Sequence, residues 1–161
     1  MKVLKYIILS LLVLLYGSQL YLGVMSTQVD NLPKLFGVGE VVFLSGSMQP
    51  TIEVGSLGIV HEEKNYKEGD IVTYIKDRTL ITHRIKEIKS DKEIIVQGDA
   101  NNIADEPISK DMIEGRIILT IPHMGSVLQI LKTPYGIAGV AGIGVVIALW
   151  PEREEEYEDE K

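Results

Sequence analysis

Residues 69–99, GDIVTYIKDRTLITHRIKEIKSDKEIIVQGD, decide the fold class of this chain. Short runs rich in β-branched residues alternate there with turn-forming groups at residues 77–78 and 90–92, as in antiparallel strands joined by hairpins. The same pattern extends from about residue 38 to residue 121. The predicted strands are residues 41–44, 57–61, 71–75, 80–88, 94–97 and 113–121. We therefore predict a mainly β fold, with a small, strongly curved antiparallel sheet or open barrel.

The N-terminal end of the chain has the pattern of a membrane anchor. Residues 6–29 contain no charged side chain, and this stretch is long enough to cross a bilayer as a helix. Lys2 and Lys5 precede this stretch, so the positive-inside rule places the N-terminus in the cytoplasm. The alternative is a cleavable signal peptide, because the sharpest apolar run covers only residues 7–15. We favour an anchor over residues 1–29, because hydrophobicity resumes at residues 20–25.

The C-terminal end predicts a second span. Residues 133–151 are uncharged and contain glycines at positions 136, 139 and 142, which allow a transmembrane helix to approach a neighbour closely. The alternative for this segment is a buried or interfacial helix. Residues 30–132 are then an extracytoplasmic β-rich domain. This division fits a chain of 161 residues with 45% hydrophobic and 24% charged side chains, which has room for one domain of about 100 residues plus membrane segments.

Charge and cysteine content exclude several classes of function. The tail, residues 152–161, holds seven acidic and two basic side chains and contributes most of the net charge of −7. It is predicted to be a solvated end, and the rest of the chain is nearly neutral, which gives no indication of nucleic-acid binding. The chain has no cysteine, so disulfides, thiol catalysis and cysteine-ligated zinc are excluded.

Residues 44–51, LSGSMQPT, interrupt a predicted strand with small side chains and end it at a proline. Taken alone, such a string indicates a structural turn. A serine in it can act as a nucleophile only with a hydrogen-bond donor beside it and a base from elsewhere in the chain.

His83 is the strongest candidate for that base. It lies in the predicted strand 80–88, where alternation places it on one face with Ile81 and Ile85. A single histidine on such a face is more often a packed core residue than a catalyst. The loop that follows the next strand, residues 97–105, contains Asp99 and Asp105 and could supply the carboxylate that orients an imidazole. This combination favours a catalytic role.

Five strings together resemble the type I signal peptidases: SGSMQPT, GSLGIV, GDIVTY, THRI and GDANN. Their order and approximate spacing are similar to those of that family, and the resemblance runs from the N-terminal anchor through Pro122. Ser-Gly-Ser-Met-x-Pro is the most specific string, and by this resemblance Ser47 is the nucleophile. The common bacterial branch has lysine where this chain has His83-Arg84. The chain thus resembles the archaeal and endoplasmic-reticulum branch, which has a Ser-His-Asp site.

The resemblance also implies roles for the neighbouring residues. The hydroxyl of Ser45 and the backbone N–H of Ser47 would form the oxyanion hole, which stabilises the negative charge of the transition state. Asp99 and Asp105 both lie in the matching segment. We assign Asp105 to the triad and Asp99 to a supporting role.

The resemblance implies a membrane-bound serine endopeptidase that removes N-terminal signal peptides from exported preproteins. It would lie in the cell membrane or the endoplasmic-reticulum membrane, with its catalytic domain on the extracytoplasmic side. The expected partners are signal-peptide-bearing preproteins with small side chains before the cut, membrane lipid and the protein-export machinery, but not nucleic acid. No cofactor or metal is expected, since no HExxH spacing occurs.

Three alternatives remain. His61 and His123 could in principle be the base, but His61 begins a polar run and His123 lies close to the second apolar segment. A non-catalytic membrane-anchored β-domain, acting as an accessory or binding subunit, would keep the fold without the activity. A self-cleaving repressor-type Ser-Lys protease has a related architecture, but this chain begins with an apolar segment where a DNA-binding domain would be expected.

Overall fold

The computed structural model describes residues 2–25 and 31–149, so the acidic tail and the end of the expected N-terminal anchor lie outside the described residues. Contacts divide the chain into two units, a β unit covering Leu22–Ile130 and a helical unit formed by the two ends of the chain. The elements are α1 (Lys2–Met25), β1 (Lys34–Leu35), β2 (Val38–Val42), β3 (Leu57–His61), β4 (Ile71–Lys76), β5 (Thr79–Ser90), β6 (Glu93–Gln97), the 3₁₀ helix η1 (Lys110–Met112), β7 (Ile113–Ile121), α2 (Met124–Leu131) and α3 (Pro134–Leu149).

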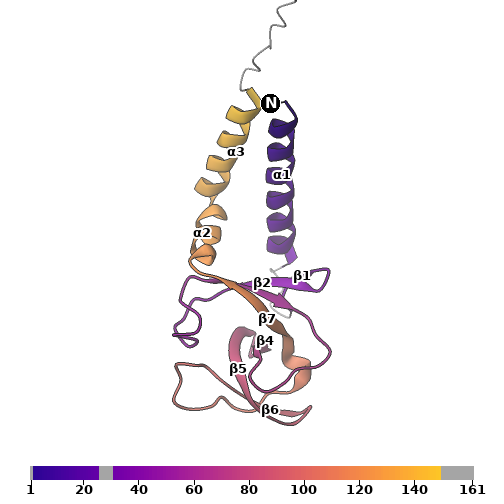
Figure 1. Ribbon diagram of the computed structural model, residues 1–161, viewed down its shortest axis with the longest axis vertical. Helices are drawn as coiled ribbons and strands as arrows, with labels where there is room; N and C mark the ends of the chain where they lie inside the picture. The colour runs from indigo at the N-terminus through magenta and orange to yellow at the C-terminus, as the bar shows by residue number, and fades with distance from the viewer. Residues whose placement is uncertain (1, 26–30, 150–161) are drawn as a thin grey trace, which may run out of the picture. The chain divides into compact units, whose positions relative to one another are not determined.

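The β unit is built on one seven-stranded antiparallel sheet with the order β1-β2-β3-β7-β4-β5-β6. The predicted mainly β, open antiparallel architecture is confirmed. β7, the last strand in the chain, runs between β3 and β4 and joins the first part of the sheet to the β4–β6 meander (Figure 1). β5, which carries His83, is paired with β4 on one side and with β6 on the other, so it lies in the interior of the sheet.

The hairpin turns lie at the turn-forming residues of the sequence. Asp77 and Arg78 link β4 to β5 with φ angles of 51° and 59°, so both are in the left-handed region that two-residue hairpins require. The resulting register places Val72 opposite His83. This register, which depends on the turn, fixes the face on which His83 points.

The apolar faces of the strands bury two clusters. One consists of Leu32, Val41, Phe43, Met48, Ile52 and Val60. The other consists of Val72, Tyr74, Ile85, Ile94, Val96 and Ile108. Burying one such side chain contributes about 1.5–3 kcal/mol. The first cluster supports the serine-containing loop, residues 43–56 between β2 and β3. The second cluster supports β5, the strand that carries His83.

The first part of the sheet differs from the prediction. The strand expected at residues 41–44 is β2, Val38–Val42, which runs through Gly39. A Cβ at Gly39 would lie 2.9 Å from the Leu32 side chain, so a glycine is needed there for close packing and does not break the strand. The two-residue β1 was not predicted, because it is too short to show a period.

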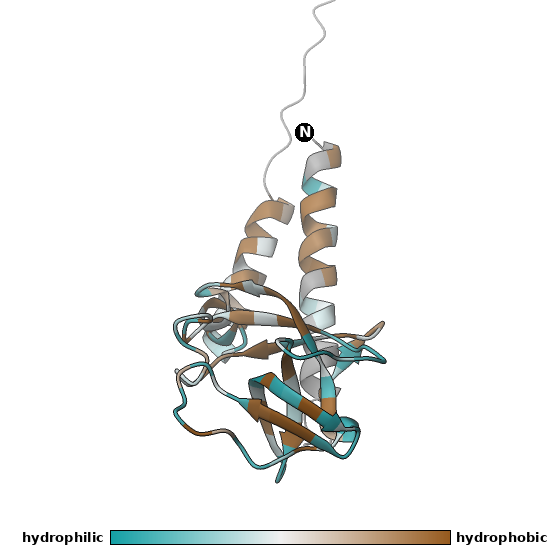
Figure 2. Ribbon diagram, turned by 60° about the horizontal axis from the view of Figure 1, so that its bottom comes forward, coloured by the Kyte–Doolittle hydropathy of each residue, from teal (hydrophilic) through white to brown (hydrophobic). Residues whose placement is uncertain are grey.

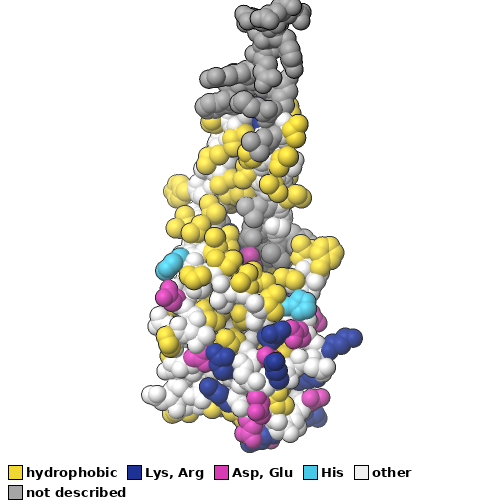
Figure 3. Space-filling model, in the orientation of Figure 1, with side chains coloured by type: hydrophobic (Ala, Val, Ile, Leu, Met, Phe, Trp, Pro, Cys, Tyr) yellow, Lys and Arg dark blue, Asp and Glu magenta, His cyan; other side chains and the backbone are white. Residues whose placement is uncertain are grey.

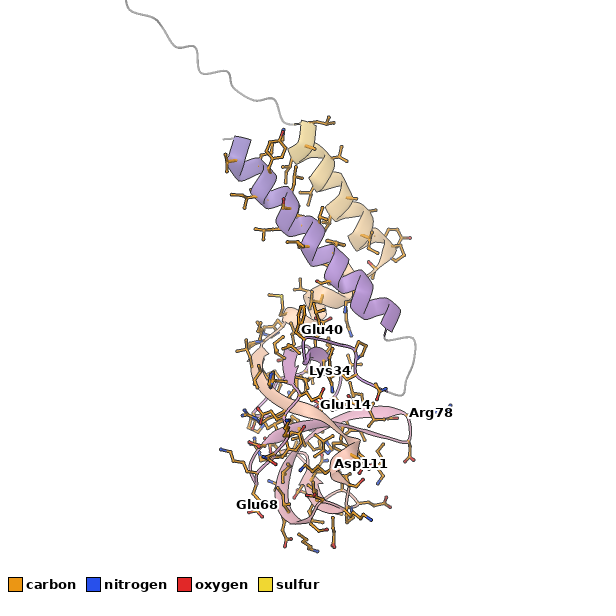
Figure 4. All side chains as sticks on the ribbon, turned by 90° about the vertical axis from the view of Figure 1, so that its right-hand side faces the viewer. Lys34, Glu40, Glu68, Arg78, Asp111 and Glu114 are labelled. Atoms are coloured by element: carbon orange, nitrogen blue, oxygen red, sulfur yellow. The ribbon has the colours of Figure 1, made fainter. Side chains whose placement is uncertain are left out.

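An ion-pair cluster ties the edge strand β1 to the sheet. Lys34 Nζ lies 3.0 Å from carboxylate oxygens of both Glu62 and Glu114, and Figure 4 shows Lys34 and Glu114 close together. Burial disfavours the charged ammonium, but the hydrogen bonds to the two carboxylates outweigh it and raise the pKa of Lys34. These two ion pairs explain how the two-residue strand β1 stays attached to the sheet.

The helical unit is apolar. Figure 2 shows α1 and α3 with mainly hydrophobic residues, and α3 contains no buried residue. Among residues 2–25 and 31–149, no single helix is both long and apolar enough to cross a membrane. In the same described part of the chain, one bent pair of helices, α2 and α3 taken together, passes the test of length and composition. The two segments expected to span the membrane are helical in α1 and α3, and that they cross a membrane stays a prediction.

Candidate active site

The serine-containing loop begins where β2 leaves the sheet. Phe43 exchanges backbone hydrogen bonds with Gly55 and Ser56, which closes the base of the loop. Inside it, Ile52 N donates to the carbonyl of Met48 at 2.9 Å, and both of these side chains are buried in the first core cluster. The loop is therefore held from below, and its serines remain on the accessible side: Ser45 is exposed and Ser47 half-buried.

Two contacts define the position of Ser47. Its Oγ lies 3.3 Å from Ser45 Oγ, so the two hydroxyls are neighbours. Its carbonyl oxygen accepts a hydrogen bond of 2.9 Å from the backbone N–H of Ala100, just after β6. A Cβ on Gly98 would lie 2.6 Å from that same carbonyl oxygen. The loop thus rests on the backbone at the end of β6, at a place that admits only glycine.

His83 is buried in β5, with 7% of its surface exposed. Its Nδ1 is in hydrogen-bond contact with Asp105 Oδ2, and the same carboxylate oxygen accepts a hydrogen bond of 2.9 Å from the Tyr74 hydroxyl. The backbone N–H of Asp105 donates to the carbonyl of Val96, so the loop folds back along β6. The structure brings together the imidazole and the acid assigned to it.

Asp99, the other acid considered, is bound elsewhere. Arg84 donates to both of its carboxylate oxygens, from Nε at 2.8 Å and from Nη2 at 2.6 Å, and also to the carbonyl of Gly69. The hydrogen bond from Arg84 lowers the pKa of Asp99, with a smaller contribution from the Thr51 hydroxyl. Asp99 therefore links β5 to the serine-containing loop. The sequence analysis gave Asp99 a supporting role without naming its partner, and that partner is Arg84.

Backbone geometry brings Ser47 and His83 to the same end of the β5–β6 pair. Arg84, next to His83, lies opposite Gln97 in the sheet register, and residues 98–100 then reach the Ser47 carbonyl. Within the described residues, no hydrogen bond joins Ser47 Oγ to the imidazole. Such bonds are often long in an unliganded enzyme and shorten once substrate is bound.

The other two histidines are separate from this cluster. His61 ends β3, with Nδ1 3.9 Å from Glu63, and His123 follows β7, with Nε2 3.8 Å from Glu53. In residues 2–25 and 31–149, no group of three or more His, Cys, Asp or Glu side chains is arranged to hold a metal ion.

Sequence reasoning did not identify Tyr74 as the partner of Asp105 or Arg84 as the partner of Asp99. Both lie in the strings GDIVTY and THRI, but the alternation of a strand shows only that a side chain faces the core. The register of β4 on β5 would have been needed to place Tyr74 on the same face as His83.

Comparisons with known proteins show what the chain is similar to. Residues 41–118, from β2 into β7, match the family described as Peptidase S24-like. Signal peptidase I W of Bacillus subtilis (strain 168) is 36% identical to the chain over 92 residues, which cover 52% of the chain and 48% of that relative. The chain thus spans about half the length of this relative. Together the two matches support a serine peptidase of the signal peptidase type.

Proposed function

We propose that the chain is a membrane-bound signal peptidase of the Ser-His-Asp type, which cleaves N-terminal signal peptides from exported preproteins. Ser47 is the nucleophile, His83 the general base and Asp105 the acid that orients the imidazole. The contact of His83 with Asp105, at the end of the β5–β6 pair on which the Ser47 loop rests, is the observation that supports this proposal most directly.

The imidazole is oriented for proton transfer. Since Nδ1 faces Asp105, the tautomer with hydrogen on Nδ1 leaves Nε2 as the acceptor for the serine proton. Oγ of Ser47 then attacks the scissile carbonyl carbon while Nε2 of His83 takes its proton. The tetrahedral intermediate collapses as His83 returns the proton to the leaving amine, and water, activated by the same base, releases the acyl group from Ser47.

The negative charge of the tetrahedral intermediate needs donors at the same place. The Ser45 hydroxyl, 3.3 Å from Ser47 Oγ, can donate one hydrogen bond to the oxyanion, and the backbone N–H of Ser47 can donate a second. Preorganised donors of this kind act on charge that develops only in the transition state and so raise the rate. The pair of neighbouring serines is thus assigned two different tasks.

The apolar helices support the membrane-bound part of the proposal. The exposed side chains of α1 include Ile7, Leu11 and Leu14. Hydrophobic side chains cover the visible face of the helical unit, whereas Lys, Arg, Asp and Glu are spread over the β unit (Figure 3). Lys2 and Lys5 favour a cytoplasmic N-terminus, which places the catalytic unit on the extracytoplasmic side. The relative named above adds signal-peptide-bearing proteins as the substrate class.

The nucleophile is tested with the full chain purified in detergent and a model preprotein with small residues before the cut. We expect processing by the wild type, none by Ser47→Ala, and wild-type processing by Ser90→Ala, which removes a serine hydroxyl from the exposed β5–β6 turn. Processing by Ser47→Ala would exclude this nucleophile. A wild type that binds preproteins without cutting them would support the non-catalytic binding domain.

The base is tested against the lysine alternative. Lys86 is exposed on the same strand as His83 and provides the matched variant. His83→Ala should be as inactive as Ser47→Ala, and Lys86→Ala should process at the wild-type rate. If Lys86→Ala abolished processing and His83→Ala retained it, the enzyme would belong to the Ser-Lys class.

A further inference from the structure

Tyr74 is a buried residue of β4, 1% exposed, to which the mechanism above gives no task. A buried phenol usually finds a hydrogen-bond partner, so a partner alone would say little. Here the acceptor is Oδ2 of Asp105, at 2.9 Å, the same atom that contacts Nδ1 of His83. Three side chains from different segments thus meet at one carboxylate oxygen.

The sheet places the phenol rigidly. Tyr74 lies opposite Ile81 of β5 and Ile113 of β7, so its strand is paired on both sides. Ile81 and His83 share a face of β5, which makes Tyr74 and His83 diagonal neighbours across the strand pair. Their rings meet edge to face with centroids 6.4 Å apart. The donor therefore has little freedom to move.

The acceptor is less restrained. Asp105 lies in the loop between β6 and η1, where one backbone hydrogen bond to Val96 holds it, and its side chain is 24% exposed against 9% for His83. Burial, and then the hydrogen bond to Asp105, raise the pKa of the Tyr74 phenol. The phenol accordingly stays protonated over the neutral pH range and donates a hydrogen bond to the carboxylate.

We propose that Tyr74 is a positioning residue, which fixes the Asp105 carboxylate behind His83 and shares the negative charge of Oδ2 with the imidazole. The proposal rests on the function proposed above. Removing the phenol oxygen has two consequences. The carboxylate keeps its contact with Nδ1 of His83 but is held less rigidly, which slows proton transfer. Its charge is no longer shared with the phenol and stabilises the imidazolium more strongly, so that protonation of His83 sets in at higher pH.

The first test is kinetic, on the full chain in detergent. Tyr74→Phe should lower kcat about 10-fold with little change in KM, since the lost hydrogen bond is to a charged group that acts on the chemical step. The acid limb of its kcat profile should move to higher pH. Tyr66→Phe is the matched control, because Tyr66 packs against the same core cluster and its phenol bonds to the backbone of Glu63. It should retain the wild-type rate and profile.

The second test does not depend on catalysis. Proton NMR titration of the imidazoles in the Ser47→Ala background should show the midpoint of His83 moving to higher pH in Tyr74→Phe and staying in place in Tyr66→Phe, with His61 and His123 as internal references. An unmoved midpoint would overturn the proposal, even with reduced kcat, because the phenol would then act only through packing. Failure of the proposed function has a different signature, namely processing that survives both Ser47→Ala and His83→Ala.

Discussion

The backbone of Gly98 lies directly against the carbonyl oxygen of Ser47, so close that an added Cβ would be 2.6 Å from it. This contact joins the end of β6 to the serine-containing loop. It sets the distance between the proposed nucleophile and the strand pair that carries the proposed base.

Gly98→Ala should therefore disturb the site more than the fold. The added methyl group must displace Ser47, and a shift of about 1 Å in a reacting group can cost about 100-fold in rate. The matched control is Gly144→Ala, in α3, where nothing lies within 4 Å of the added carbon. Turnover and melting temperature of both variants give the measurement. A Gly98→Ala enzyme of wild-type turnover would show that the contact does not position Ser47.

The Ser45→Ala enzyme should have a reduced kcat but should remain active. If its hydroxyl is one of the two oxyanion donors, its loss should cost about 10²–10³-fold in kcat and leave KM nearly unchanged. Ser47→Ala, in contrast, should show no turnover above background. Single-turnover kinetics with a preprotein separate the two cases, and a Ser45→Ala enzyme with normal kcat would remove Ser45 from the oxyanion hole.

The two acids should respond differently to the same substitution. Asp105→Asn keeps the shape of the side chain but removes its charge behind His83, so turnover should fall by up to about 10⁴-fold, as in other triads, with a melting temperature close to the wild type. Asp99→Asn breaks the two-point pair with Arg84 and should chiefly lower the melting temperature. A folded, inactive Asp99→Asn beside an active Asp105→Asn would reverse the assignment.

The Asp99–Arg84 pair should also make stability depend on pH. Since Arg84 lowers the pKa of Asp99 in the folded state, the pair stabilises the fold above the ordinary aspartate range. This stabilisation is lost as pH falls through the lowered value. The difference in melting temperature between wild type and Asp99→Asn should thus be largest near neutral pH and vanish in strong acid. A difference that does not change with pH would mean that packing, not charge, accounts for the effect.

The proposed membrane-bound state predicts the behaviour of the chain in vesicles. The full chain should stay with the membrane pellet after an alkaline carbonate wash, because burial in lipid would hold its apolar helices. Protease added from the cytoplasmic side should leave the β unit intact. Release into the supernatant would exclude an integral anchor, and digestion of the β unit would reverse the orientation inferred from Lys2 and Lys5.

Local patterns in the sequence were enough to predict the class of the fold. Alternation and turn residues indicated antiparallel strands, and the strands expected at residues 57–61 and 113–121 are those of the structure. The candidate residues Ser45, Ser47, His83, Asp99 and Asp105 were likewise visible as residue types in short strings. Such signals depend on residues two to four positions apart, and a sequence displays them directly.

Only the tertiary structure decided which of these residues meet. β7 enters the sheet between β3 and β4, Asp105 rather than Asp99 contacts His83, and Tyr74 reaches Asp105 from 31 positions away. These contacts depend on strand register and on the path of a loop. Both are set by many weak interactions between distant segments, and no local period records them.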